Sequence, residues 1–148
     1  MRAASENRSK LHFQFGWPAS LGAPGAGRRA VDVLPLGIDR ERVDALRLLI
    51  SEVVTSAVVH SGGNDRGRID MMVEVTAGSV RVEIRDGGRG FVPHASRTTR
   101  SQGGLGTVVL DRLSSAWGTL STPEFGVWFE FPGGYRTERR VKSERLVS

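Results

Sequence analysis

The sequence lacks cysteine, and it has no apolar run of the length that crosses a membrane. The first absence excludes disulfides, thiolate-bound zinc and a cysteine nucleophile, and it fits a reducing compartment. The segment Met1 to Glu6 has no apolar core of the kind found in signal peptides. Together these absences predict a cytoplasmic protein that does not associate with membranes.

An excess of positive charge is also lacking over most of the chain. The net charge is +5, yet residues 11–135 hold 13 basic and 13 acidic side chains. The excess lies in residues 1–10 and 136–148. We therefore predict a neutral domain over 11–135 between a flexible basic arm and a flexible basic tail, without direct nucleic-acid binding. The alternative, DNA binding through the tails, requires that deletion of 136–148 abolishes it.

The 148 residues suffice for one domain with one core, and 39% apolar and 25% charged residues are ordinary for a globular protein. Periodicity predicts the secondary-structure elements. In chain order these are an edge strand at 11–15, a helix at 24–34, a helix from 39 to 60, strands at 69–75 and 80–84, a mobile loop over 93–103, a helix from 104 through Ala116, and strands near 120 and over 127–131.

This order lacks the strict strand-helix alternation of a parallel doubly wound sheet. It favours an α+β two-layer sandwich, with a mixed, mainly antiparallel sheet and its helices on one face.

The helix from 39 to 60 carries two stripes. Asp39 is suited to cap it, and one stripe is apolar: Leu46, Ile50, Val53 and Ala57. The other stripe, at spacing four, is polar: Glu52, Ser56 and His60. Side chains at this spacing point the same way, so a carboxylate and a hydroxyl share one helix face.

Three short motifs could form a site. They are the polar helix stripe, the turn Asp86-Gly87-Gly88-Arg89-Gly90 at a strand end, and Gly103-Gly104-Leu105-Gly106 at a helix start. Taken singly, each has a structural explanation: a solvated or paired glutamate, a turn aspartate bonded to its own backbone, and a flexible joint. Their order and spacing together indicate a nucleotide pocket.

Each motif would have its own role in such a pocket. Backbone N–H groups of residues 105–108 would bind phosphate oxygens at the positive end of a helix, and Gly104 and Gly106 would let the backbone approach them. Asp86 would accept a hydrogen bond from the exocyclic amine of adenine, with Gly88 and Gly90 leaving room for the ring. Glu52 could act as general base toward an attacking hydroxyl.

These motifs, closed by Val127-Trp128-Phe129-Glu130-Phe131-Pro132, resemble the Bergerat-fold (GHKL, histidine-kinase-like) ATP-binding superfamily. The resemblance covers residues 11–132 and is greatest to small bacterial anti-sigma-factor serine-protein kinases. It implies ATP between a helix layer and a lid, with Glu52 as base, Asp86 on adenine, and Gly88, Gly90, Gly104, Leu105 and Gly106 shaping the nucleotide site.

The resemblance also implies Mg²⁺ as a cofactor, and a sigma factor and an anti-anti-sigma antagonist as partners, the antagonist being phosphorylated on serine. It admits a homodimer. Two positions depart from the family pattern: Ser56 replaces the usual asparagine that binds Mg²⁺, and Gly126 replaces a threonine of the adenine site. Ser56 would then be the metal ligand. The alternative is a catalytically weak or inactive module that acts by sequestering a protein.

Overall fold

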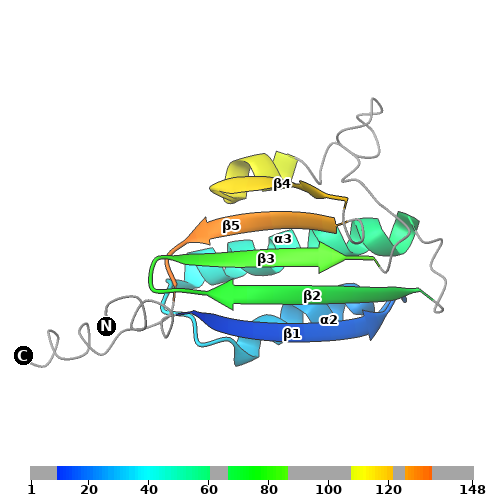
Figure 1. Cartoon of the computed structure of the whole chain (residues 1–148), viewed down its shortest axis with the longest axis horizontal. Helices are drawn as coiled ribbons and strands as arrows, with labels where there is room; N and C mark the ends of the chain where they lie inside the picture. Colours follow the sequence, from blue (N-terminus) through cyan, green and yellow to red (C-terminus); the bar gives the residue numbers. More distant parts are fainter. Residues whose placement is uncertain (1–9, 61–66, 87–107, 122–125, 135–148) are drawn as a thin grey trace, which may run out of the picture.

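The computed structural model describes residues 10–60, 67–86, 108–121 and 126–134, and all structural statements below concern these residues. They form a five-stranded sheet in the order β1-β2-β3-β5-β4, and the helices lie on one face of it (Figure 1). The elements are β1 (Leu11–Pro18), α2 (Ala23–Ala30), the 3₁₀ helix η1 (Val31–Val33), α3 (Arg40–His60), β2 (Arg68–Val75), β3 (Ser79–Arg85), β4 (Ala116–Leu120) and β5 (Gly126–Pro132).

The prediction of an α+β sandwich with helices on one face is confirmed. All four strand pairings in the described part of the chain are antiparallel, so the sheet there is antiparallel rather than mixed. The strand at 11–15 is an edge strand, as predicted, and it continues to Pro18. Strands 69–75 and 80–84 form the predicted hairpin.

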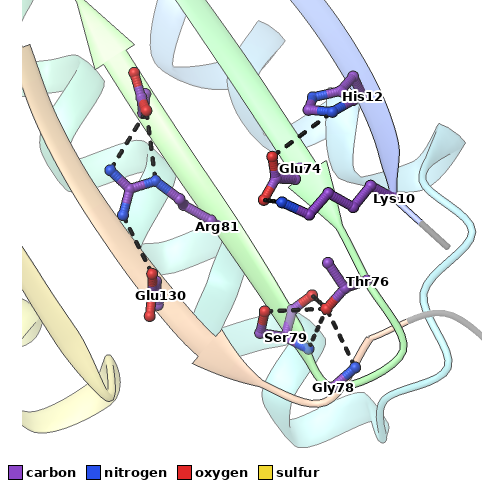
Figure 2. Close-up of polar contacts among 9 residues, drawn as sticks. Lys10, His12, Glu74, Thr76, Gly78, Ser79, Arg81 and Glu130 are labelled. Carbon is purple, nitrogen blue, oxygen red and sulfur yellow. Dashed lines mark hydrogen bonds and ion pairs between the residues drawn. The ribbon is translucent and has the colours of Figure 1, made fainter. Parts of the chain in front are cut away.

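The hairpin turn between β2 and β3 is organised by one hydroxyl. Thr76 Oγ1 accepts hydrogen bonds from the backbone N–H groups of Gly78, at 3.2 Å, and Ser79, at 3.0 Å (Figure 2). Thr76 N also donates to the carbonyl of Ser79 at 2.9 Å. A turn held in this way fixes the register of both strands, and with it the point where β3 ends.

The core lies between the sheet and α3. The alternating side chains of β2, β3 and β5 that face the helices are buried, and so is the apolar stripe of α3 predicted from the sequence. Fully burying an aliphatic side chain of this size contributes about 1.5–3 kcal/mol. The position of α3 under the sheet is therefore strongly fixed.

Two predicted helix ends were wrong. Helix 24–34 passes into η1 and ends at Val33, because Leu34 precedes Pro35 and adopts extended backbone angles. Ala116 does not continue the helix that the structure describes over 108–113; it begins β4. There Ser114 N still donates to the carbonyl of Leu110, whereas Ser115 N donates to that of Glu130 on β5. Pairing with the sheet thus ends the helix.

None of the helices among the described residues is both long and apolar enough to cross a membrane.

The contact between α2 and α3 generates a stability prediction. A Cβ on Gly27 would lie 2.8 Å from Ile50 Cγ2, on a stiff β-branched side chain. We expect Gly27→Ala to lower the free energy of unfolding by about 1–3 kcal/mol through overpacking, although alanine favours helix more than glycine does.

Gly25→Ala is the matched control in the same helix. Its Cβ would meet only the ends of the Arg28 and Arg29 side chains, which can move. Urea denaturation should show Gly25→Ala as stable as the unmodified chain or up to about 1 kcal/mol more stable. Equal destabilisation by both substitutions would contradict the close helix contact.

Candidate functional site

The polar stripe lies on a helix, α3, that is capped at its N-terminus and buried along one face. Asp39 Oδ1 accepts a hydrogen bond from Arg42 N at 2.8 Å, so the predicted cap is present, and α3 then runs unbroken for 21 residues. Glu52 and Ser56 are both half-buried on this helix. Side chains held on a buried helix keep their positions better than side chains on loops.

The neighbouring helix shows which flank of α3 these residues occupy. Gly27 of α2 lies against Ile50 and Val54, and Arg28 Nη1 donates to Ser51 Oγ at 2.8 Å. Successive residues are turned by about 100° around a helix. Glu52 and Ser56 therefore lie on the flank of α3 that points away from α2.

A groove shows what this flank faces instead. Ala45 lies on the same stripe, seven residues before Glu52, and it lines a groove together with Arg112, Leu113 and Phe131. The flank with Glu52 and Ser56 is thus on the side of the helical segment 108–113. That segment directly follows the glycines from which phosphate contacts were predicted.

Asp86 follows the last residue of β3. The residue is 6% exposed, and among the described residues it is the one charged or polar residue that is buried. Carboxylates are seldom buried in this way, because removing the charge from water is costly unless partners compensate. A buried carboxylate at a strand end is a candidate for binding a polar ligand group.

The elements that carry these residues converge at one end of the molecule. Figure 1 shows α3 behind the sheet, with its C-terminal end on the same side as the C-terminal end of β3. The C-terminal half of α3 carries Glu52 and Ser56, and Asp86 comes directly after β3. The arrangement is the one that a cleft bounded by α3 and the end of β3 requires.

Five predicted site residues lie outside the described residues: Gly88, Gly90, Gly104, Leu105 and Gly106. The loop over 93–103 lies outside them as well, as does the side chain of His60. Their predicted roles stay predictions.

Two acidic side chains of the described residues could contact a ligand at this end of the molecule. Asp86 offers a buried acceptor for an exocyclic amine, and Glu52 offers a fixed carboxylate. No group of three or more histidine or acidic side chains that could hold a metal occurs in the described part of the chain. Magnesium typically takes one or two protein ligands and several phosphate oxygens or waters, which Ser56 and a nucleotide could supply.

Gly126 is more constrained than the sequence showed. It pairs with Arg85 across β3 and β5, next to Asp86. A Cβ at position 126 would lie 2.9 Å from both Arg85 Cγ and the Ile84 carbonyl oxygen. The sequence motif indicated the missing threonine but not this crowding, because the crowding depends on the strand register. The groove residues Ala45 and Arg112 were also missed, since no local pattern joins them.

Known proteins resemble this chain in sequence and in fold. Residues 18–123 match the family model described as the histidine kinase-like ATPase domain. Among solved structures, the crystal structure of the RsbU and RsbW domains of Rv1364c from Mycobacterium tuberculosis is similar to this chain, with a TM-score of 0.57 and 18% identity. The match covers 86% of this chain and 35% of that chain, so this chain spans little more than a third of its length. No curated protein matches.

The crowding at Gly126 makes a testable prediction. We expect Gly126→Thr, which restores the family residue, to lower the free energy of unfolding by about 1–3 kcal/mol, because backbone atoms of β3 cannot move aside. Gly78→Ala is the control, since its Cβ would meet nothing within 4 Å. Thermal denaturation of both variants decides the matter, and an unchanged melting temperature for Gly126→Thr would show that the strand pair has room.

Proposed function

Because this chain belongs to the histidine kinase-like ATPase domain family, which implies ATP binding, we propose that it is an ATP-dependent serine-protein kinase of the anti-sigma-factor type. One observation carries the proposal. Glu52 is fixed on the flank of α3 that faces segment 108–113, and the buried Asp86 lies toward the same end of the molecule. An acid on a rigid helix and a buried acceptor are the parts that phosphoryl transfer from ATP needs from this side of a cleft.

Each predicted site residue has its own role in the proposed phosphoryl transfer. Asp86 accepts a hydrogen bond from the exocyclic amine of the purine, while Gly88 and Gly90 leave space for the ring. Backbone N–H groups of residues 105–108 hold phosphate oxygens, and Gly104 and Gly106 allow the backbone to approach them. Glu52 accepts the proton of the serine hydroxyl as its oxygen bonds to the terminal phosphorus, while the bond from that phosphorus to the bridging oxygen breaks and ADP leaves with the electron pair. Ser56 would provide a hydroxyl oxygen to Mg²⁺, which would supply positive charge next to the phosphates.

The proposed partners come from the resemblance in the motifs. They are a sigma factor, which the chain binds, and an anti-anti-sigma antagonist, whose serine it phosphorylates in the cytoplasm. The catalytic domain extends over 11–135, with the basic arm 1–10 and the tail 136–148 outside it. The structural neighbour, whose solved domains include an RsbW domain, supports this fold for the proposed activity.

A second function is favoured by Ser56 and Gly126. A hydroxyl on a one-carbon stem reaches less far than a carboxamide, and Gly126 brings no side chain to the base site. A chain with these two changes could hold nucleotide weakly and act by sequestering a protein. Calorimetric titration with ATP, with and without Mg²⁺, separates the two functions: tight magnesium-dependent binding supports the kinase, and its absence supports sequestration.

The proposed base predicts the result of one substitution. Glu52→Gln should lower kcat for transfer to the antagonist by about 10²–10⁴-fold, the contribution of a general base, with ATP affinity little changed. The measurement is transfer of labelled phosphate in the presence of Mg²⁺.

Glu74→Gln is the matched control, because Glu74 is also a half-buried glutamate but lies on the sheet face without helices. It should retain full transfer. Transfer that is equally fast in both variants, or absent from the unmodified chain with a cognate antagonist, would refute the catalytic proposal.

The proposed role of Ser56 as metal ligand predicts that one substitution raises the affinity for ATP. Ser56→Asn should strengthen ATP binding in Mg²⁺, because a carboxamide oxygen reaches further, and should change binding little in the presence of a chelator. The same titration measures both. Equal affinities for the two chains under both conditions would show that position 56 does not contact the metal.

A further inference from the structure

The groove beside α3 lies outside the proposed nucleotide site. Its lining residues on α3 come from the N-terminal half of the helix, whereas Glu52 and Ser56 are in the C-terminal half. The rest of the lining comes from segment 108–113 and from the end of β5. The volume of the groove, about 380 Å³, is at the low end for a pocket that binds a small molecule. It suits a few side chains of a peptide segment better than a cofactor.

The groove has an apolar floor and a charged rim. The floor includes Leu113, which is partly buried, and Phe131, which belongs to the core. The exposed rim carries Glu41, Arg42 and Arg112. Within the ranges that the structure describes, none of these three side chains takes part in an ion pair. An apolar centre with a polar rim is typical of surfaces that bind a polypeptide.

The C-terminal segment of the chain begins beside this groove. Pro132 lines the groove and is two residues before Gly134, the last described residue. A Cβ on Gly133 would lie 3.8 Å from Nη1 of Arg42, a rim residue. The carbonyl of Gly134 accepts a hydrogen bond from Gly37 N at 2.6 Å, next to the start of α3. Residues 135–148 therefore start within reach of the groove.

The N-terminal arm starts much further away. Lys10 comes directly before β1, which is the edge strand at the other end of the sheet order, β1-β2-β3-β5-β4. Two strands, β2 and β3, separate it from β5 and the groove. Of the two basic segments, only the C-terminal one begins at the groove.

The composition of residues 135–148 matches the groove. Val141, Leu146 and Val147 are apolar, and the segment has five basic and two acidic side chains. Its apolar residues suit the floor. Its glutamates suit the two rim guanidiniums, and its basic residues suit the rim carboxylate. Charges of both signs on the rim thus meet charges of both signs on the segment.

The segment is long enough to cover the groove. The seven residues from Gly134 to Val141 span at most about 25 Å, and the part of α3 from Asp39 to Ala45 covers about 9 Å. A segment tethered in this way is present at an effective concentration of about millimolar. Even weak contacts therefore suffice for docking, although ordering the segment costs conformational entropy.

We propose that residues 135–148 dock reversibly in this groove of the same chain, with Val141 over the floor formed by Leu113 and Phe131. The docked segment contacts α3 and segment 108–113 together, and so holds that segment against the helix. The inference concerns the groove and the C-terminal segment alone, and it does not depend on the proposed kinase activity.

Disulfide trapping in the full chain tests the docking. Because the chain has no cysteine, one introduced pair can form only one intrachain disulfide. Such a bond needs Cα atoms within about 7 Å. We expect the pair Ala45→Cys and Ser143→Cys to form it readily. Their effective concentration, measured in glutathione buffers, should exceed that of a control pair about tenfold or more, because docking holds the two thiols together.

Val33→Cys with Ser143→Cys is the matched control. Val33 is 66% exposed in η1, and it is only four residues from Gly37, which is bonded to Gly134. A segment that does not dock would reach this position at least as easily as it reaches Ala45. Arg112→Cys with Ser143→Cys is a second groove pair on an exposed residue, where the substitution does not disturb the core. It should behave like the first groove pair.

Val141→Asp should remove the advantage of both groove pairs, because it places a charge over the apolar floor. Circular dichroism should show every variant folded. Equal effective concentrations in the groove and control pairs, disulfides that form mainly between two molecules, or an advantage that survives Val141→Asp would each overturn the proposal.

Discussion

The packing of α3 against the antiparallel sheet is the contact on which the rest of the structure depends. Its buried face consists of side chains with almost no exposed surface: Leu46, Leu49, Ile50, Val53, Val54 and Ala57. Because these side chains set the rotation of the helix about its axis, they also decide where its polar flank points. The packing of α3 on the sheet therefore stabilises the fold and also orients Glu52 and Ser56.

The flank is further fixed from the side of α2. Gly27 allows α2 to approach α3 closely, and the ion pair between Arg47 and Asp32 joins α3 to η1. These contacts occupy one side of α3 and leave the other for segment 108–113. Because α3 is held against both the sheet and α2, its polar flank keeps a defined orientation.

Local patterns predicted most of the fold. The cap at Asp39, the amphipathic helix and the hairpin all depend on residues close in sequence, and the structure confirms them. The start of β4 at Ala116 depends instead on pairing with β5, and the crowding at Gly126 on its register with β3, so neither could be deduced from spacing. Within the site, periodicity placed Glu52 and Ser56 on one face, whereas the burial of Asp86 is a tertiary property.

The end of β5 has a consequence for how the molecule can be handled. Gly133, with φ +97°, donates to the Gly78 carbonyl, and Gly134 accepts a hydrogen bond from Gly37 N. A Cβ added at Gly134 would collide with the Thr76 carbonyl oxygen. Gly134, the last described residue, therefore lies beside the β2–β3 turn, at the end of the sheet remote from the C-terminal ends of α3 and β3 (Figure 1). A fluorophore attached next to Gly134 would start at the opposite end of the sheet from the C-terminal ends of α3 and β3, so it would not obstruct a ligand that binds there.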